Sequence, residues 1–430
     1  MSASTTPSSE SLERDATALH AHHGKVDAGE IAIGVIIGRT SEFFDFFVYA
    51  IASVVVFPQL IFPFAGPIGG TLLSFGVFAL AFLARPLGTA LFIAIDQRFG
   101  RGAKLTIALF LLGTSTVAVA FLPGYETIGV AAAVLLALFR IGQGVALGGA
   151  WDGLASLLAL NAPESRRGWY AMIPQLGAPI GLIVASALFA FFLNTLSAAD
   201  FLDWGWRYPF FVAFAINVVA LFARLRIVVT PSFQNLFETR ELQPTPVKAA
   251  IKAEGPRIAI GAFAPLASFA MFHMVTVFPL SWVFLFTQET PVRFLLIEMV
   301  GAVFGLLAIL ASGLLADRYG RRTLLAVTAA GIAAFSGFIL LGLSFGQASG
   351  PVASSFSLAN RYTSSALTSD LAWLFGAGFA PLVALWISSQ FGLIAAGAYL
   401  LSGAVCTLVA LWLNRELARS SSDKTRAPRT

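Results

Sequence analysis

A short charged loop occurs twice in this chain, about half a chain apart, and each copy follows a long apolar stretch. The later copy runs from Gly313 to Arg322. The earlier copy runs from Asp96 to Arg101, with Lys104 just beyond it. A repeat of this kind is typical of membrane proteins built from two related parts. The sequence therefore predicts two membrane-embedded halves, with a path for a small solute between them.

The composition excludes an ordinary soluble globule. Of the 430 residues, 57% are hydrophobic and 11% are charged, whereas roughly a quarter of the residues in a soluble domain are charged. The mean hydropathy is +0.82. The basic residues behind the net charge of +5 occur in short clusters between apolar stretches. We interpret them as determinants of membrane topology, and we expect a lipid bilayer rather than a nucleic acid as the partner.

The sequence gives no indication of an enzyme, a cofactor or a metal site. Cys406 is the single cysteine, so no intramolecular disulfide can form, and we interpret it as a small packing residue. The polar first thirty residues lack the apolar core of a signal peptide. A phosphate-binding Gly-Lys-Ser/Thr loop is also absent, so ATP hydrolysis is not the expected energy source. The expected energy source is therefore a gradient of a solute or an ion.

A window of roughly 20 apolar residues, the length that crosses the hydrocarbon core, locates the membrane spans. It finds candidate spans at residues 31–57, 70–93, 104–122, 127–157, 169–193, 208–226, 258–286, 294–315, 323–345, 365–388 and 391–413. The predicted fold is all-α and polytopic.

The long polar segment 227–257, rich in proline and alternating charge, is expected to link the two halves. The predicted order is a disordered cytoplasmic tail, an N-terminal transmembrane half, a cytoplasmic linker, a C-terminal transmembrane half and a C-terminal tail, at residues 1–30, 31–226, 227–257, 258–413 and 414–430. With the N-terminus inside the cell, most basic loop residues lie on the cytoplasmic side, against Arg207 and Arg293 outside. This asymmetry predicts a cytoplasmic N-terminus.

Several motifs follow one another in a fixed order, densely in the first half of the chain. They are Arg85 to Gly88, Arg140 to Gly149, Pro174 to Gly181, Trp204 to Phe210, Thr230 to Phe233 and, more thinly, Asp317 to Arg322, Arg361 to Thr363 and Gly376 to Leu382. Together they resemble the metabolite:proton symporters of the major facilitator superfamily, which include carriers of citrate, 2-oxoglutarate, shikimate and proline/betaine. The resemblance implies a fold of two six-helix-type halves in the bacterial inner membrane, monomeric and without a cofactor.

One region departs from this family. The stretch between Arg322 and Arg361 is too short for two full crossings and a turn, although the family fold requires two crossings there. A single crossing would place the basic C-terminal tail outside, against the positive-inside trend. We therefore expect an incomplete ninth-tenth helix region rather than a reversed topology.

The repeated loop suggests a conformational latch. An acid at a helix end that faces arginine on the partner helix can form an ionic contact in one state and lose it in another. The predicted latch residues are Asp96, Arg98, Arg101, Asp317, Arg318, Arg321 and Arg322. The alternative is that the basic cluster only fixes topology. In the earlier copy, Gln97 occupies the position at which the family has Asp, so its role as a latch is weaker.

The first span contains a polar stripe. Arg39, Glu42, Asp45 and Tyr49 recur at three, three and four residues, so a helix places them on one face. Ionisable groups at membrane depth are costly and indicate a solute or proton path, with Arg39 and Glu42 as an i,i+3 pair. The alternative is a fixed ion pair that holds helices together. The neighbouring phenylalanines are interpreted as packing residues.

The fourth span contains a second polar face, formed by Arg140, Gln143 and Trp151. Arg140 is the best single candidate for proton-coupled switching or for holding a carboxylate, because guanidinium stays charged in a low dielectric and offers forked donors. The alternative is an arginine satisfied by backbone carbonyls. Relatives commonly place Glu at the position of Ala150, whereas Asp152 lies two residues on. Three alternatives follow from this departure. Asp152 takes over the proton role of that Glu, or proton coupling rests on Glu42 and Asp45, or the coupling is altered.

Two functional classes remain open from the sequence. The leading hypothesis is a secondary active transporter that brings in a small organic carboxylate or zwitterion with a proton. The rival is a non-transporting sensor or a degenerate carrier, and proton-driven export is a third possibility. His273, Glu298 and Asp370 are weaker candidates: His273 is interpreted as a packing residue, and Glu298, which follows an exterior loop, as solvated.

Overall fold

The computed structural model describes residues 28–150, 153–228, 243–334 and 356–426. Within these ranges the structure is helical, which confirms the predicted all-α class. Trp151, Asp152, most of the predicted N-terminal tail, much of the linker and residues 335–355 of the ninth-tenth region lie outside the described residues.

The helices of residues 28–228, called the first half below, are short connectors alternating with long spans. Their bounds are α2 Ala28–Val55, α3 Phe57–Leu60, α4 Gly66–Ala120, α5 Tyr125–Ile128, α6 Ala131–Gly149, α7 Leu154–Asn161, α8 Arg167–Met172, α9 Gly177–Thr195, α10 Ala198–Asp203 and α11 Tyr208–Val228. The helices of residues 247–426, called the second half, are α13 Val247–Phe263, α14 Leu266–Val275, α15 Val277–Phe286, α16 Pro291–Tyr319, α17 Arg321–Ala334, α19 Arg361–Trp373, α20 Ala380–Phe391 and α21 Ala396–Arg426.

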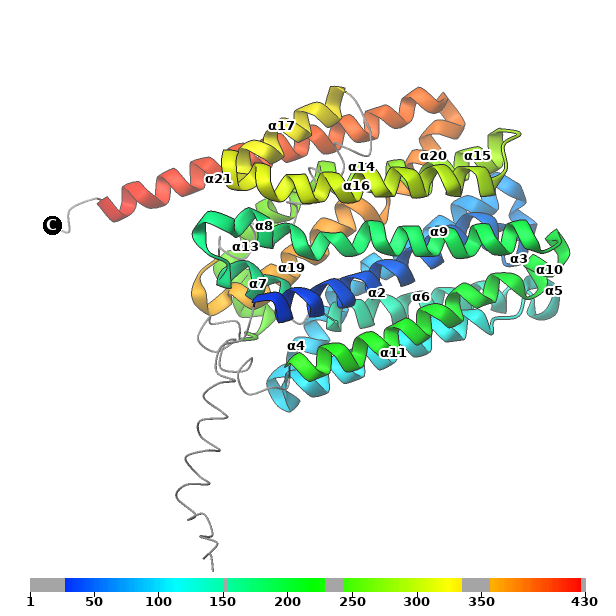
Figure 1. Ribbon diagram of the computed structural model, residues 1–430, viewed down its shortest axis with the longest axis horizontal. Helices are drawn as coiled ribbons and strands as arrows, with labels where there is room; N and C mark the ends of the chain where they lie inside the picture. The colour runs from blue at the N-terminus through cyan, green and yellow to red at the C-terminus, as the bar shows by residue number, and fades with distance from the viewer. Residues whose placement is uncertain (1–27, 151–152, 229–242, 335–355, 427–430) are drawn as a thin grey trace, which may run out of the picture.

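The long helices lie side by side along the longest axis of the molecule (Figure 1). Eight helical stretches among the described residues are long and apolar enough to cross a membrane. Helix α2 has 28 residues, which is also membrane length, but it carries the charged stripe of Arg39, Glu42 and Asp45. Apolar helices together with an internal charged stripe are typical of a bundle whose outer surface contacts lipid and whose interior holds polar groups.

The two copies of the charged loop have the same backbone geometry. Gly100 turns the chain within the long helix α4 at φ 82°, and Gly320 separates α16 from α17 at φ 84°. Positive φ values are open to glycine without the steric cost that a Cβ atom brings. The sequence repeat is therefore also a structural repeat. We call the end of the bundle that carries these two loops the loop end.

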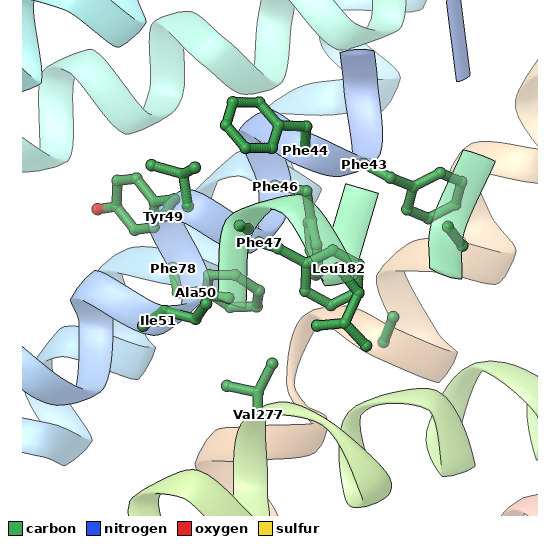
Figure 2. Close-up of a cluster of buried hydrophobic side chains, with 14 of the residues drawn as sticks. Phe43, Phe44, Phe46, Phe47, Tyr49, Ala50, Ile51, Phe78, Leu182 and Val277 are labelled. Carbon is green, nitrogen blue, oxygen red and sulfur yellow. The ribbon is translucent and has the colours of Figure 1, made fainter. Parts of the chain in front are cut away.

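The core packs around the second part of α2. Figure 2 shows Phe43, Phe44, Phe46, Phe47, Tyr49, Ala50 and Ile51 of this helix packed among Phe78 of α4, Leu182 of α9 and Val277 of α15. Phe44 and Phe47 are each 1% exposed. The prediction that the phenylalanines of this span pack in the interior is therefore correct for these two residues. Because residues from both halves contact it, α2 lies at the seam between them.

Close packing between α4 and α6 depends on glycine. A Cβ atom at Gly144 would overlap the carbonyl oxygen of Ala81, and one at Gly148 would overlap the backbone of Arg85 and Thr89. Small residues let helix backbones approach in membranes, where packing is a main source of stability. These glycines therefore set the positions of Arg140 and Gln143 relative to α4.

We predict that Gly144→Ala lowers the thermal midpoint of the purified protein, because the added methyl meets backbone that cannot move aside. Overpacking of this kind costs about 1–3 kcal/mol. Gly76→Ala on α4 is the matched control, since a Cβ atom there meets nothing within 4 Å. Equal midpoints for the two variants would show that α4 and α6 do not need this close approach.

Candidate functional site

The polar stripe of α2 is joined to α11 by a shared carboxylate. Arg39 donates from Nη1 to Glu42 at 2.7 Å, so the predicted i,i+3 pair is present. Arg224 of α11 donates to the other oxygen of Glu42 at 2.8 Å and also donates to the carbonyl oxygen of Ala150. Glu42 is thus held between two guanidinium groups. The sequence did not indicate Arg224, because it lies 182 residues from Glu42.

A chain of hydrogen bonds connects Arg140 to Asp45 through neutral side chains. Arg140 donates to Gln143 at 3.0 Å, Gln143 donates to Thr116 at 2.9 Å, and Thr116 donates to Asp45 at 2.6 Å. All four side chains are buried, with exposed fractions of 2% or less. The structure therefore brings the predicted residues Arg140, Gln143 and Asp45 together. Thr116 was missed, because a threonine in an apolar span carries no distinctive signal.

Arg140 also stacks on aromatic rings. Its guanidinium carbon lies 4.0 Å from the ring centroid of Tyr49 and 4.8 Å from that of Phe78. Its Nε donates to the carbonyl oxygen of Phe78 at 3.2 Å. One of its hydrogen bonds is therefore of the kind expected for an arginine satisfied by backbone carbonyls. Among the described residues no carboxylate lies within ion-pair distance of Arg140. The desolvated cation is held by cation–π contacts and neutral acceptors.

Two adjoining cavities open along the α2 stripe. The central cavity is lined by Arg39, Glu42, Phe43, Phe46, Ala81, Phe82, Arg85, Arg140, Leu147 and Trp373. The second cavity shares Arg39, Glu42, Arg85 and Leu147 with the first and extends to Gly34, Gly153 and Arg224. Phe43 and Phe46 belong to the buried core, in agreement with their interpretation as packing residues, and they also line the central cavity.

A buried ion pair closes the central cavity between the two halves. Arg85 of α4 donates from Nε to Asp370 of α19 at 2.7 Å, and Thr89 also donates to Asp370. Asp370 is 3% exposed. The pair joins residues 285 apart. Asp370 was ranked as a weak candidate, and the signal for it was an acid close to the start of an apolar span.

The later copy of the charged loop bridges the halves. Asp317 accepts hydrogen bonds from the backbone N–H groups of Gly168 at 2.5 Å and Trp169 at 3.1 Å. The hydrogen bonds given for this acid come from backbone, which the sequence did not indicate, and the predicted arginine contact stays a prediction. Burial lowers the pKa of Arg321, the positive charge of Arg167 lowers it further, and Asp317 raises it. Arg321 therefore lies in the electrostatic field of this contact.

The earlier copy makes different contacts. Asp96 lies 3.2 Å from Lys104 and 4.0 Å from Arg101, within its own half. Lys104 in turn donates to the hydroxyl of Tyr362 in the second half at 2.5 Å. The guanidinium of Arg101 lies 5.1 Å from the ring centroid of Tyr362. The weaker latch predicted for this copy thus reaches the other half through basic groups rather than through the acid.

The remaining basic residues of the loops are more peripheral. Arg98 and Arg318 are exposed and lie over the rings of their neighbours Phe99 and Tyr319. Arg322 donates to the carbonyl oxygen of Leu411 in α21. These positions fit a role in topology for Arg98 and Arg318.

Two further ionisable residues are buried. His273 of α14 is 0% exposed, and its ring centroid lies 5.2 Å from Phe46 and 5.3 Å from Phe272. Neither ring nitrogen has a hydrogen-bond partner among the described residues. Glu298 of α16 is 3% exposed and lies 3.4 Å from Ser186 of α9. The expectation that Glu298 is solvated was therefore wrong.

A bundle of membrane-length helices with charged, cavity-lining groups at the seam of two halves defines a multi-pass membrane transporter rather than an enzyme. Comparison with known proteins gives the same class. The family model described as "Major Facilitator Superfamily" matches residues 42–366. The chain belongs to the major facilitator superfamily.

The relatives and solved structures agree with this assignment. The chain is 35% identical over 424 residues to the inner membrane metabolite transport protein YhjE of Escherichia coli strain K12, covering 91% of this chain and 95% of that protein. It is 32% identical over 301 residues to the shikimate transporter of the same strain, covering 69% and 68%. The crystal structure of a D-xylose-proton symporter matches the fold with a TM-score of 0.65 at 19% identity, covering 88% of this chain and 96% of that one.

We predict that Asp317→Ala opens the loop end, because it removes two hydrogen bonds between the halves; at this exposed position each contributes about 1 kcal/mol. The measurement is maleimide labelling of Ser312→Cys in a Cys406→Ser background, since Ser312 is 0% exposed and lies on α16 beside the contact with α8. Labelling should accelerate about tenfold or more.

Arg318→Ala is the matched control for this experiment, because Arg318 is adjacent to Asp317 but lies over the ring of its own neighbour Tyr319. It should label at the rate of the background protein. Unchanged labelling in Asp317→Ala would show that this contact does not hold the halves together.

Proposed function

We propose that this protein is a secondary active symporter that carries a small organic carboxylate or zwitterion, together with a proton, across the bacterial inner membrane. The observation that carries the proposal is the buried chain from Arg140 to Asp45. It places beside a cavity a cation that bonds no carboxylate among the described residues, and it places an acid at the other end of three hydrogen bonds. Arg140 can bind the substrate anion, Asp45 can bind the proton, and both belong to one hydrogen-bond network.

Charge balance gives this arrangement a reason to couple the two cargoes. In the empty site, the positive charge of Arg140 is offset by the negative charge of Asp45 across the network. A carboxylate that binds Arg140 adds a second negative charge in a water-poor interior, where unbalanced charge is costly. A proton on Asp45 restores the balance. Anion and proton are therefore expected to load together and to leave together.

Alternating access supplies the second half of the proposal. The contacts of the loop end between Asp317 and α8 and between Lys104 and Tyr362, and the deeper pair of Arg85 and Asp370, are proposed to break when the site opens toward the loop end. The orientation follows from charge. The basic residues of both loops gather at this end, and cytoplasmic loops carry such an excess. We therefore assign the loop end, and the N-terminus, to the cytoplasm.

The names of two relatives support the proposal that the transported compound is a metabolite. One is called a metabolite transport protein and another a shikimate transporter, and shikimate is a carboxylate. The cavity lining, with three arginines and one glutamate, favours an anionic group on the substrate of this chain as well.

We predict that Asp45→Asn abolishes proton-driven accumulation in proteoliposomes but leaves substrate exchange in place. Asparagine keeps the hydrogen bond from Thr116 but cannot take up a proton. The measurement compares uptake under an inward proton gradient with counterflow under no gradient. Arg140→Ala and Glu42→Gln should instead abolish both activities, because they remove a cargo contact and the acid that holds two arginines.

Gradient-driven accumulation that survives in Asp45→Asn would overturn the assignment of Asp45 as the proton site. Loss of exchange together with accumulation in this variant would contradict the separation of the two roles. No substrate-dependent proton movement by the wild-type protein would favour a sensor, and outward-directed transport would favour an exporter.

A further inference from the structure

The chemical class of the substrate can be narrowed from the lining of the central cavity, on the basis of the transport function proposed above. Of the three arginines in this lining, two already bond a carboxylate directly: Arg39 bonds Glu42 at 2.7 Å and Arg85 bonds Asp370 at 2.7 Å. Arg140 has neutral hydrogen-bond acceptors among the described residues. Arg140 is therefore the arginine of this lining that has a position for one substrate carboxylate.

The opposite lining is aromatic and comes from three helices. Phe43 and Phe46 belong to α2, Phe82 to α4 and Trp373 to α19. The ring centroid of Trp373 lies 5.8 Å from Phe43, 6.3 Å from Phe46 and 6.3 Å from Phe82, the last pair stacked at 20°. These four side chains, the aromatic wall, present ring faces and edges at the spacing at which aromatic groups pack.

The backbone fixes this wall in place. Trp373 ends α19, and the chain continues into a five-residue π-helix, Leu374–Gly378. Such turns are rare and are often found at functional sites. A Cβ atom at Gly378 would lie 2.9 Å from the Cβ atom of Phe82, so the missing side chain lets the second half approach the wall. Phe269 packs on the other side of Trp373, with ring centroids 4.4 Å apart.

We propose that the substrate is a monocarboxylic acid whose carboxylate sits on an aromatic or alicyclic ring. The carboxylate faces Arg140 of α6, and the ring packs against the aromatic wall. Such a molecule places one anion against the arginine that has no directly bonded carboxylate among the described residues, and it places apolar surface against the aromatic rings. It also contacts α2, α4 and α6 of the first half and α19 of the second half at once.

Two other substrate classes fit this lining less well. A tricarboxylate brings three negative charges, whereas Arg39 and Arg85 are already paired, so two of its charges would be buried without partners. A quaternary ammonium group binds aromatic faces, but Glu42 already accepts hydrogen bonds from Arg39 and Arg224 and cannot readily balance a third cation. These classes are the comparison compounds in the test.

Trp373 links this substrate contact to the seam. It lies three residues after Asp370 on α19, so the two side chains are neighbours on one helix face. A ring packed on Trp373 therefore borders the ion pair of Asp370 with Arg85. The part of the cavity that contacts the substrate ring therefore lies next to the Arg85–Asp370 pair, which separates the cavity from the loop end.

The test is equilibrium binding of radiolabelled benzoate to the purified wild-type protein in lipid nanodiscs at neutral pH, with no proton gradient. We expect saturable binding that cyclohexanecarboxylate displaces and that citrate and glycine betaine do not. Binding in the absence of a gradient does not depend on proton coupling. Benzoate binding without gradient-driven accumulation would thus uphold this inference and overturn the proposed symport.

Variants locate the binding to the cavity. Trp373→Leu and Phe82→Leu should each weaken benzoate binding about threefold to tenfold, the effect of one lost aromatic contact. Arg140→Gln should abolish it. Phe189→Leu is the matched control, because Phe189 is a 0% exposed aromatic residue of α9 outside the cavity lining, and its affinity should equal that of wild type.

The folded state of each variant is checked by its thermal midpoint and elution volume. Two results would overturn the inference and leave the proposed symport standing: preferential binding of citrate or glycine betaine, or benzoate affinity unchanged in both Arg140→Gln and Trp373→Leu. No saturable binding of benzoate by wild type would overturn it as well.

Discussion

The ion pair of Arg85 and Asp370 is the constraint on which the arrangement of the two halves depends. At a rise of about 1.5 Å per residue, Arg85 lies about 20 Å along α4 from the turn at Gly100, deep in the bundle. A charge at that depth is expensive unless it is paired. Because the partner belongs to the other half, neither half can satisfy its own charge while they are apart. Separation of the halves must therefore be offset by another interaction or by water.

The other buried charges follow the same rule with different partners. Glu42 is shared by Arg39 and Arg224, and all three belong to the first half. Arg140 has no carboxylate at ion-pair distance among the described residues and is held by the rings of Tyr49 and Phe78. Arg140 is thus the cavity-lining arginine with a position for an outside anion, and under the proposed function a proton on Asp45 balances the added charge. The other arginines of the lining already bond carboxylates of the protein.

Local patterns predicted much of the fold and part of the site. Apolar spans, the repeated loop and the i,i+3 pair of Arg39 and Glu42 follow from short-range periodicity, which a helix converts directly into geometry. Contacts such as Arg85 with Asp370, or Thr116 with Asp45, join distant segments whose register only tertiary packing sets. The partner of Asp317 was missed because it is backbone, which every residue carries. Asp152 lies outside the described residues, so its predicted role stays a prediction.

The central claim is that a buried polar seam between the halves opens and closes. The most direct measurement is the distance between spin labels at Phe99 and Tyr319, which are exposed and lie on the two copies of the loop. In nanodiscs, pulsed electron spin resonance should resolve a short and a long population, and Arg85→Gln should enrich the long one. A single distance, unchanged by Arg85→Gln, would contradict the account.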